Sequence, residues 1–155
     1  MRVVSLALCA GAVAVALPHT AHAQVASALA VKWGPGPDFL PAGVRFALIQ
    51  GDPSKSVVYT IRLRFPANFR FPSHFHPTDE QVTVLSGTFL VGMGDTVKLA
   101  KAMTLTAGGF ITAPADAHHF AATRGVTVVQ VSGEGPFAIT YVNDSDDPRH
   151  KKATP

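Results

Sequence analysis

From residue 44 onward, apolar and polar side chains alternate over short runs, a pattern typical of half-buried β-strands. The clearest run spans residues 56–65. One side of it carries Val57, Tyr59, Ile61, Leu63 and Phe65, and the other carries Val58, Thr60, Arg62 and Arg64. Further strands are predicted at residues 44–50, 81–85, 88–91, 104–106, 109–113, 119–123, 126–132 and 137–142. Closely spaced strands of this kind predict an all-β sandwich or barrel.

The strand pattern also sets the boundaries of the predicted domain. It predicts a single barrel over residues 44–143, preceded by a lead-in segment at residues 24–43. The lead-in contains Trp33-Gly34-Pro35-Gly36-Pro37, which excludes a regular helix because proline lacks an N–H group. Residues 97–103 could hold one short helical turn, and residues 144–155 are polar and predict a flexible tail.

The first 23 residues have a different character. Arg2 precedes an apolar run of about 15 residues, shorter than the roughly 20 that a membrane-spanning helix needs. Pro18 and then Ala21-His22-Ala23 follow, which is the order of a secretory signal peptide with cleavage after Ala23. We therefore expect a periplasmic or secreted protein with no membrane partner after signal removal; an uncleaved N-terminal anchor is the alternative.

The composition excludes some kinds of ligand, crosslink and partner. The single cysteine, Cys9, lies in the predicted signal peptide, so the mature chain would contain neither thiolate ligands nor disulfides. The formal net charge of the chain is only +3, and the basic residues are scattered along the sequence. Both observations argue against a nucleic-acid partner.

Candidate metal ligands occur in two segments. His74 and His76 are two apart, so in an extended strand both imidazoles point to one side, and Glu80 follows after a bend at Pro77. A second segment contains His118 and His119, of which one could meet the first three ligands from a neighbouring strand. Three imidazoles and one carboxylate suit Zn, Mn, Fe, Ni, Co or Cu without selecting among them.

These residues carry a resemblance to the cupin superfamily. His74, His76, Glu80 and Gly87 match its first motif, with Asn68 where a glycine is usual. Gly108, Pro114 and His119 match its second motif, in which Asp116 replaces a glycine and Thr123 an asparagine. Aspartate tolerates tight turns, so Asp116 is a mild departure. The chain also resembles small exported bacterial cupins of unassigned activity.

The resemblance implies a double-stranded β-helix, or jelly-roll, barrel that binds one divalent transition-metal ion through His74, His76, Glu80 and His119. It also implies a homodimer and a small-molecule ligand or substrate. Such a protein could be a metal-dependent oxygenase or isomerase. It could instead be a non-catalytic module that binds or senses a metal or small ligand, and the sequence leaves both open.

Few other residues could carry out acid–base chemistry. Glu80 could act as a base by leaving the metal, and Tyr59 and Tyr141 are weak candidates, followed by Gln130 and Thr83. Asp79 could orient a ligand histidine or lie in a solvated loop. His118 should point away from His119 and belong to the surroundings of the site or to the surface.

Overall fold

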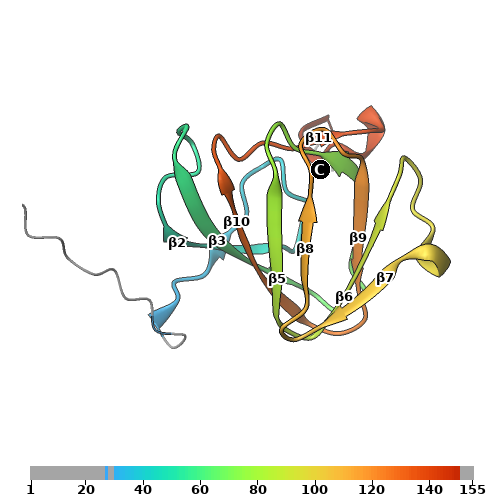
Figure 1. Cartoon of the computed structure of the whole chain (residues 1–155), viewed down its shortest axis with the longest axis horizontal. Helices are drawn as coiled ribbons and strands as arrows, with labels where there is room; N and C mark the ends of the chain where they lie inside the picture. Colours follow the sequence, from blue (N-terminus) through green and yellow to red (C-terminus); the bar gives the residue numbers. More distant parts are fainter. Residues whose placement is uncertain (1–26, 28–29, 151–155) are drawn as a thin grey trace, which may run out of the picture.

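The computed structural model describes residues 27 and 30–150, and it consists of two facing antiparallel β-sheets (Figure 1). The six-stranded sheet, sheet A, has the order β1-β2-β3-β10-β5-β8, and the five-stranded sheet, sheet B, has the order β11-β4-β9-β6-β7. The strands are β1 (Gly34–Pro35), β2 (Arg45–Gln50), β3 (Val58–Phe65), β4 (Arg70–Phe75), β5 (Glu80–Ser86), β6 (Thr88–Met93), β7 (Met103–Thr106), β8 (Phe110–Ala113), β9 (His119–Thr123), β10 (Thr127–Glu134) and β11 (Thr140–Tyr141).

The predicted all-β fold is confirmed, and the alternating apolar residues of β3 face the core. Tyr59, Ile61, Leu63 and Phe65 are buried, and Thr60 and Arg62 on the other side are half-buried. The inner faces of the two sheets supply one apolar core, which includes Val82, Val84, Val129, Val131, Phe71, Phe89, Val91 and Ala121.

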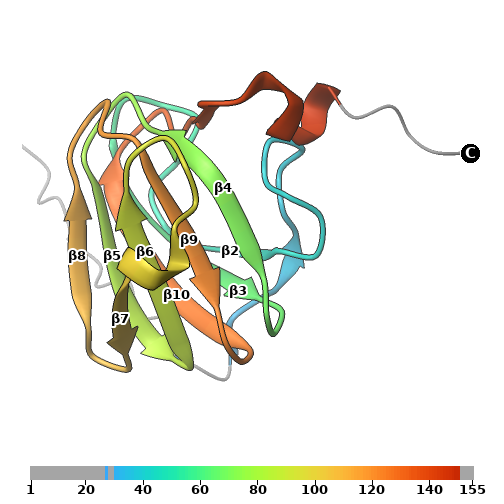
Figure 2. The same ribbon diagram turned by 90° about the vertical axis from the view of Figure 1, so that its right-hand side faces the viewer.

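The predicted strand at residues 137–142 is shorter than expected. Only β11 pairs, with Thr140 opposite Phe75 and Tyr141 opposite His74. The preceding residues bury Phe137 and Ile139 in the core instead of extending the sheet, and this leaves backbone groups free for other contacts. The short turn expected within residues 97–103 is η2 (Leu99–Lys101), which lies beside β6 (Figure 2).

The predicted signal peptide, residues 1–23, lies outside the described residues. Residues 144–150, within the expected flexible tail, form the short turns η3 (Asp144–Asp146) and η4 (Pro148–His150). The buried carboxylate of Asp147 joins these turns to Arg149, whose guanidinium also donates to the Ile139 carbonyl. Within the described part of the chain, no helix is long and apolar enough to span a membrane.

The barrel has two different ends. Strands β5, β7 and β9 begin at one end, where β4, β6, β8 and β10 finish. We call this the histidine end, because His74, His76 and His119 lie there. The opposite end carries the β5–β6 hairpin and the connections from β7 to β8 and from β9 to β10, at the bottom of Figure 1.

Candidate metal centre

The four predicted ligands come together between the two sheets at the histidine end. His74 near the end of β4 lies directly opposite His119 at the start of β9, so their side chains share the inner face of sheet B. His76 follows β4, and Glu80 opens β5 in the facing sheet. All four residues are buried, with exposed fractions of 2–8%.

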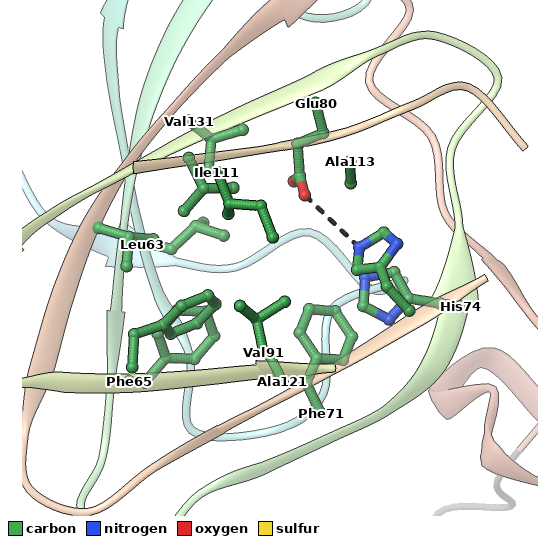
Figure 3. A pocket seen from close by; sticks show the side chains of 14 residues that line it. Leu63, Phe65, Phe71, His74, Glu80, Val91, Ile111, Ala113, Ala121 and Val131 are labelled. Atoms are coloured by element: carbon green, nitrogen blue, oxygen red, sulfur yellow. Dashed lines mark ion pairs between the residues drawn. The ribbon is translucent and has the colours of Figure 1, made fainter. Parts of the chain in front are cut away.

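The ligand atoms are close enough to surround one ion. Ring nitrogens of His74, His76 and His119 lie within 4.8 Å of one another. Glu80 Oε2 lies 3.4 Å from His76 Nε2 and 3.6 Å from His119 Nε2. Figure 3 shows the Glu80 carboxylate pointing across the space between the sheets toward the imidazoles.

Backbone carbonyls orient the three rings in the same way. The Nδ1 atoms lie 2.7 Å from the Pro72 carbonyl for His74, 2.8 Å from Ala138 for His76 and 2.9 Å from Ala117 for His119. A carbonyl can only accept, so each Nδ1 carries a proton, and Nε2 is the atom that each ring can offer to an ion. This is the arrangement that a histidine adopts as a metal ligand.

One of these Nε2 atoms lacks any hydrogen-bond partner among the described residues. His76 Nε2 is buried, and Glu80 Oε2 lies 3.4 Å away, which is long for a hydrogen bond. Leaving a buried polar atom unsatisfied costs about 1–3 kcal/mol. A metal ion bound by His74, His76, His119 and Glu80 would satisfy this atom, so the residues fit the ion that the resemblance implies.

The electrostatics of the site also suit a cation. Burial lowers the pKa of His74 well below its ordinary value, and the neighbouring His119 and His76 lower it further, so this ring is neutral. Burial also opposes protonation of His76, but the Glu80 carboxylate outweighs it and raises the pKa. Burial alone would raise the pKa of Glu80; His76 and His119 instead hold it well below its usual range, so the carboxylate stays ionised.

Aromatic rings pack against two of the histidines. The Phe71 ring stacks on His74, with centroids 4.1 Å apart and planes 20° apart. Phe137 stacks on His76 at 5.8 Å and 17°. Because Phe137 also contacts Phe39 and Tyr59, the His76 ring is fixed from the lead-in and from sheet A.

A small cavity adjoins the ligands. It measures about 20 Å³, which is room for about one water molecule. Apart from His74, Glu80 and His119, its walls are entirely apolar (Figure 3). They comprise Leu63, Phe65, Phe71, Val82, Phe89, Val91, Ile111, Ala113, Ala121, Val129 and Val131.

The structure separates the two neighbouring histidines. His119 faces the cavity, whereas the His118 ring stacks on Phe75 at 4.9 Å and its Nδ1 lies 2.6 Å from Asp95 Oδ1. The His118 side chain is 37% exposed, against 5% for His119. His118 therefore ties the start of β9 to the connection that follows β6 and contributes no atom to the histidine cluster.

The other residues suggested for acid–base chemistry or for orienting a ligand make structural contacts. The Tyr141 hydroxyl donates to the Phe39 carbonyl at 2.8 Å, and burial raises its pKa. Tyr59 lies in the core, where burial and then the Glu80 charge raise its pKa. Asp79 accepts the Ala115 N–H at 2.8 Å, so it joins two connections and orients no histidine. Gln130 and Thr83 oppose each other on β10 and β5, and Gln130 accepts from Arg62.

Sequence reasoning missed the groups that orient the ligands. They are the main-chain carbonyls of Pro72, Ala117 and Ala138, which any residue could supply. A partial signal exists for two of them, because Pro72 and Ala117 each stand two residues before the histidine that they hold. Ala138 lies 62 positions from His76, so no local pattern could reveal it.

Comparisons with known proteins agree with this architecture. The family model of the ChrR cupin-like domain matches residues 21–138. The polyketide cyclase RemF from Streptomyces resistomycificus has a TM-score of 0.68 at 17% identity, covering 82% of this chain and 90% of its own. A protein of Methylibium petroleiphilum PM1, provisionally described as an acetylacetone dioxygenase, has a TM-score of 0.63 at 23% identity, covering 85% and 89%.

An RmlC-like cupin from Shewanella frigidimarina NCIMB 400 is a third similar structure. Its TM-score is 0.56 at 14% identity, and the match covers 70% of this chain and 87% of that one. At these identities the likeness establishes the shared jelly-roll fold alone. No curated protein matches the sequence.

Proposed function

The chain belongs to the ChrR cupin-like domain family, and we propose that it is a metal-dependent enzyme of the oxygenase or isomerase type that acts on a small organic molecule. His74, His76, Glu80 and His119 would hold one divalent transition-metal ion. The observation that carries this proposal is the convergence of three carbonyl-oriented imidazoles and one ionised carboxylate, with a buried Nε2 atom of His76 left without a partner.

Such an ion supplies Lewis-acid, water-activating or oxygen-activating chemistry when it is bound. The residues of the chain do the rest. The three Nδ1–H groups hold the rings through backbone carbonyls, and Glu80 supplies a negative charge inside an apolar barrel. The apolar wall excludes water from this charge, which strengthens its interactions.

The similar structures are consistent with a small organic substrate. They include a polyketide cyclase and the protein provisionally described as an acetylacetone dioxygenase, and an oxalate oxidase matches with a TM-score of 0.52. These descriptions belong to those proteins. They support only the choice of substrates for a first screen, namely β-diketones, catechols and small carboxylic acids.

A second candidate function is a non-catalytic module that binds or senses a metal or small ligand. The size of the cavity favours it, because about 20 Å³ admits one water-sized group and no organic substrate unless the barrel widens. A substrate that binds inside this cavity therefore requires movement of the apolar wall, whereas binding of an ion alone does not.

Oxygen consumption separates the two candidates. We would load the metal-free protein with Fe(II), Mn(II), Ni(II) or Co(II) and follow oxygen uptake and product formation with the substrates above. The enzyme proposal predicts turnover that disappears in His76→Ala and persists in the matched control His118→Ala. Full metal occupancy without turnover for every metal and substrate would contradict it and favour the binding module.

We also propose that the protein is exported and cleaved after Ala23, and that it forms a homodimer. The order of charge, apolar run and Ala21-His22-Ala23 supports export. Amino-terminal sequencing of the mature protein should begin at Gln24, and retention of Met1 would contradict cleavage. Light scattering should give twice the mass of the mature chain, and a monomer would contradict the homodimer.

A further inference from the structure

Two methionines occupy an unusual position. The sequence has three methionines, and the two within the described residues are Met93, which ends β6, and Met103, which begins β7. Their exposed fractions are 50% and 51%. Other apolar residues, such as Leu48 and Phe110, are exposed to the same extent. Met93 and Met103 differ from them because they lie on adjacent strands and carry polarizable thioethers, which recur at binding surfaces.

Strand alternation places both side chains on the inner face of sheet B. Along β6, Phe89 and Val91 line the cavity, and Met93 is the next residue on that face. Met103 lies directly opposite Val91 across the β6–β7 pair, and Leu105, two residues on, packs against the core. Both thioethers therefore lie on the same face as His74 and His119.

The pairing register brings the methionines beside the histidine cluster. Met93 lies directly opposite His119 in the β6–β9 pair, where Cβ atoms are about 4.5–5.5 Å apart. Met103 is the diagonal neighbour of Met93, at a Cα separation of about 7–8 Å. Two long unbranched side chains can converge across that distance. Their exposure places them at the solvent side of the buried histidines.

The chemistry of two thioethers selects a particular class of ion. Thioether sulfur is a soft, uncharged ligand that favours Cu(I) over hard divalent cations. The imidazoles of the adjacent cluster also suit copper.

We propose that Met93 and Met103 form a Cu(I) site at the mouth of the histidine cluster, and that copper enters the centre through it. The second part rests on the proposed metal centre, and the first does not. The ion passes from sulfur to nitrogen ligands as Cu(I), so no oxidant or reductant takes part.

Ag(I), a monovalent ion that stays in one oxidation state, serves as the probe for the thioether site. The metal-free mature chain, which begins at Gln24 and contains no methionine besides Met93 and Met103, would carry ¹³C-labelled methionine methyl groups. We expect the Met93 and Met103 signals to shift together and saturate at one equivalent. Met93→Leu/Met103→Leu should weaken Ag(I) binding at least about tenfold. Signals that stay in place, or unchanged affinity in the double variant, would overturn the site.

Co(II) absorption reports on the histidine centre separately. Met93→Leu/Met103→Leu should bind Co(II) as the wild type does, because both leucines keep the apolar volume and neither sulfur is needed for a divalent ion. A normal Co(II) spectrum with no Ag(I) effect at the methionines would refute the thioether site alone. Ag(I) shifts without Co(II) binding would refute the proposed metal centre alone.

Entry through the thioethers is tested by the rate of loading. Cu(I) buffered at low free concentration should fill the histidine centre at least about fivefold more slowly in the double variant, with the same final occupancy. The matched control adds Leu105→Met to the double variant. This change places a thioether on the same face of β7 but deeper in the sheet, and it should not restore the loading rate. Equal loading rates in wild type and double variant would overturn the entry route.

Discussion

At the scale of single residues, the site depends on which atom of each imidazole is already occupied. Nδ1 of His74, His76 and His119 faces a backbone carbonyl, so Nε2 is the atom offered in every case. His118 shows the contrast, because its Nδ1 faces Asp95 and its ring lies flat on Phe75. Adjacent histidines in one segment thus have different roles because a strand alternates its faces.

This difference predicts unequal effects of two neighbouring substitutions. His119→Ala removes one of the converging Nε2 atoms and should weaken Co(II) binding at least about a hundredfold, as judged by titration of the visible absorption bands. His118→Ala leaves the cluster intact and should change the affinity less than about threefold. If His118→Ala empties the site while His119→Ala does not, the choice between them is wrong.

The raised pKa of His76 predicts proton release on metal binding. Without metal, the Glu80 carboxylate keeps His76 protonated to a pH above the ordinary histidine value of 6.5, whereas a ligand imidazole must be neutral. Affinity should therefore fall as the pH falls through this raised pKa. Calorimetry at about pH 6, below this pKa, in two buffers of different ionisation enthalpy should reveal release of about one proton from His76. Equal heats in both buffers would contradict this.

At the scale of elements, the sequence was informative wherever alternation and turn chemistry agree. The strand predicted at residues 119–123 is observed with the same bounds as β9. Asn68 and Asp116, which replace the expected glycines of the motifs, both have left-handed backbones with φ of 57° and 59°. Asparagine and aspartate are the residues that tolerate this region best after glycine.

The sequence was uninformative where distant segments decide the structure. Residues 137–142 alternate like a strand, but the burial of Phe137 and Ile139 takes the first part out of the sheet. The Ala138 carbonyl then turns to His76. The ligand pair His74 and His119 could be predicted from the motifs, whereas the carbonyl contact across 62 positions could not, because it depends on tertiary packing.

The geometry of the β5–β6 hairpin predicts that a side chain at Gly87 would destabilise the fold. Its φ is +86°, and a Cβ atom there would lie 2.5 Å from the Val126 carbonyl oxygen. Gly87→Ala should lower the free energy of unfolding by at least about 2 kcal/mol in urea denaturation. Gly125→Ala is the control, because a Cβ there meets no atom within 4 Å, and it should be nearly neutral. Equal stabilities of the two variants would contradict this account of the hairpin.

At the scale of the whole molecule, the acidic residues gather toward one end of the barrel. The ten acidic residues of the sequence all lie toward the histidine end, in its connections, at the strand ends there or beside Arg149. They are Asp38, Asp52, Asp79, Glu80, Asp95, Asp116, Glu134, Asp144, Asp146 and Asp147. Arg45, Arg64, Arg70 and Arg124 lie at the opposite end, where Arg45 and Arg64 are cross-strand partners. Lys55 and Arg149 also lie toward the histidine end, paired with Asp52 and Asp147, and Lys98 and Lys101 lie in the β6–β7 connection. The acidic residues outnumber these basic ones, so a net positive protein presents a local negative field around its candidate metal centre.

This local negative field predicts that salt slows metal uptake. A cation is attracted toward the histidine end over distances of about a Debye length, which is about 30 Å at 0.01 M and 10 Å at 0.1 M salt. Stopped-flow mixing with Co(II) should show an association rate that falls severalfold between these salt concentrations. Asp116→Asn/Glu134→Gln should reduce this dependence, and a rate independent of salt would contradict the role of the field.

The central claim is that His74, His76, Glu80 and His119 hold one metal ion, and elemental analysis tests it most directly. The protein would be purified under mild conditions, without chelators, from the compartment in which it accumulates. The account predicts about one transition-metal ion per chain, lost in His119→Ala. Less than about 0.2 ion per chain in the wild type, with no recovery after incubation with any divalent transition metal, would contradict it.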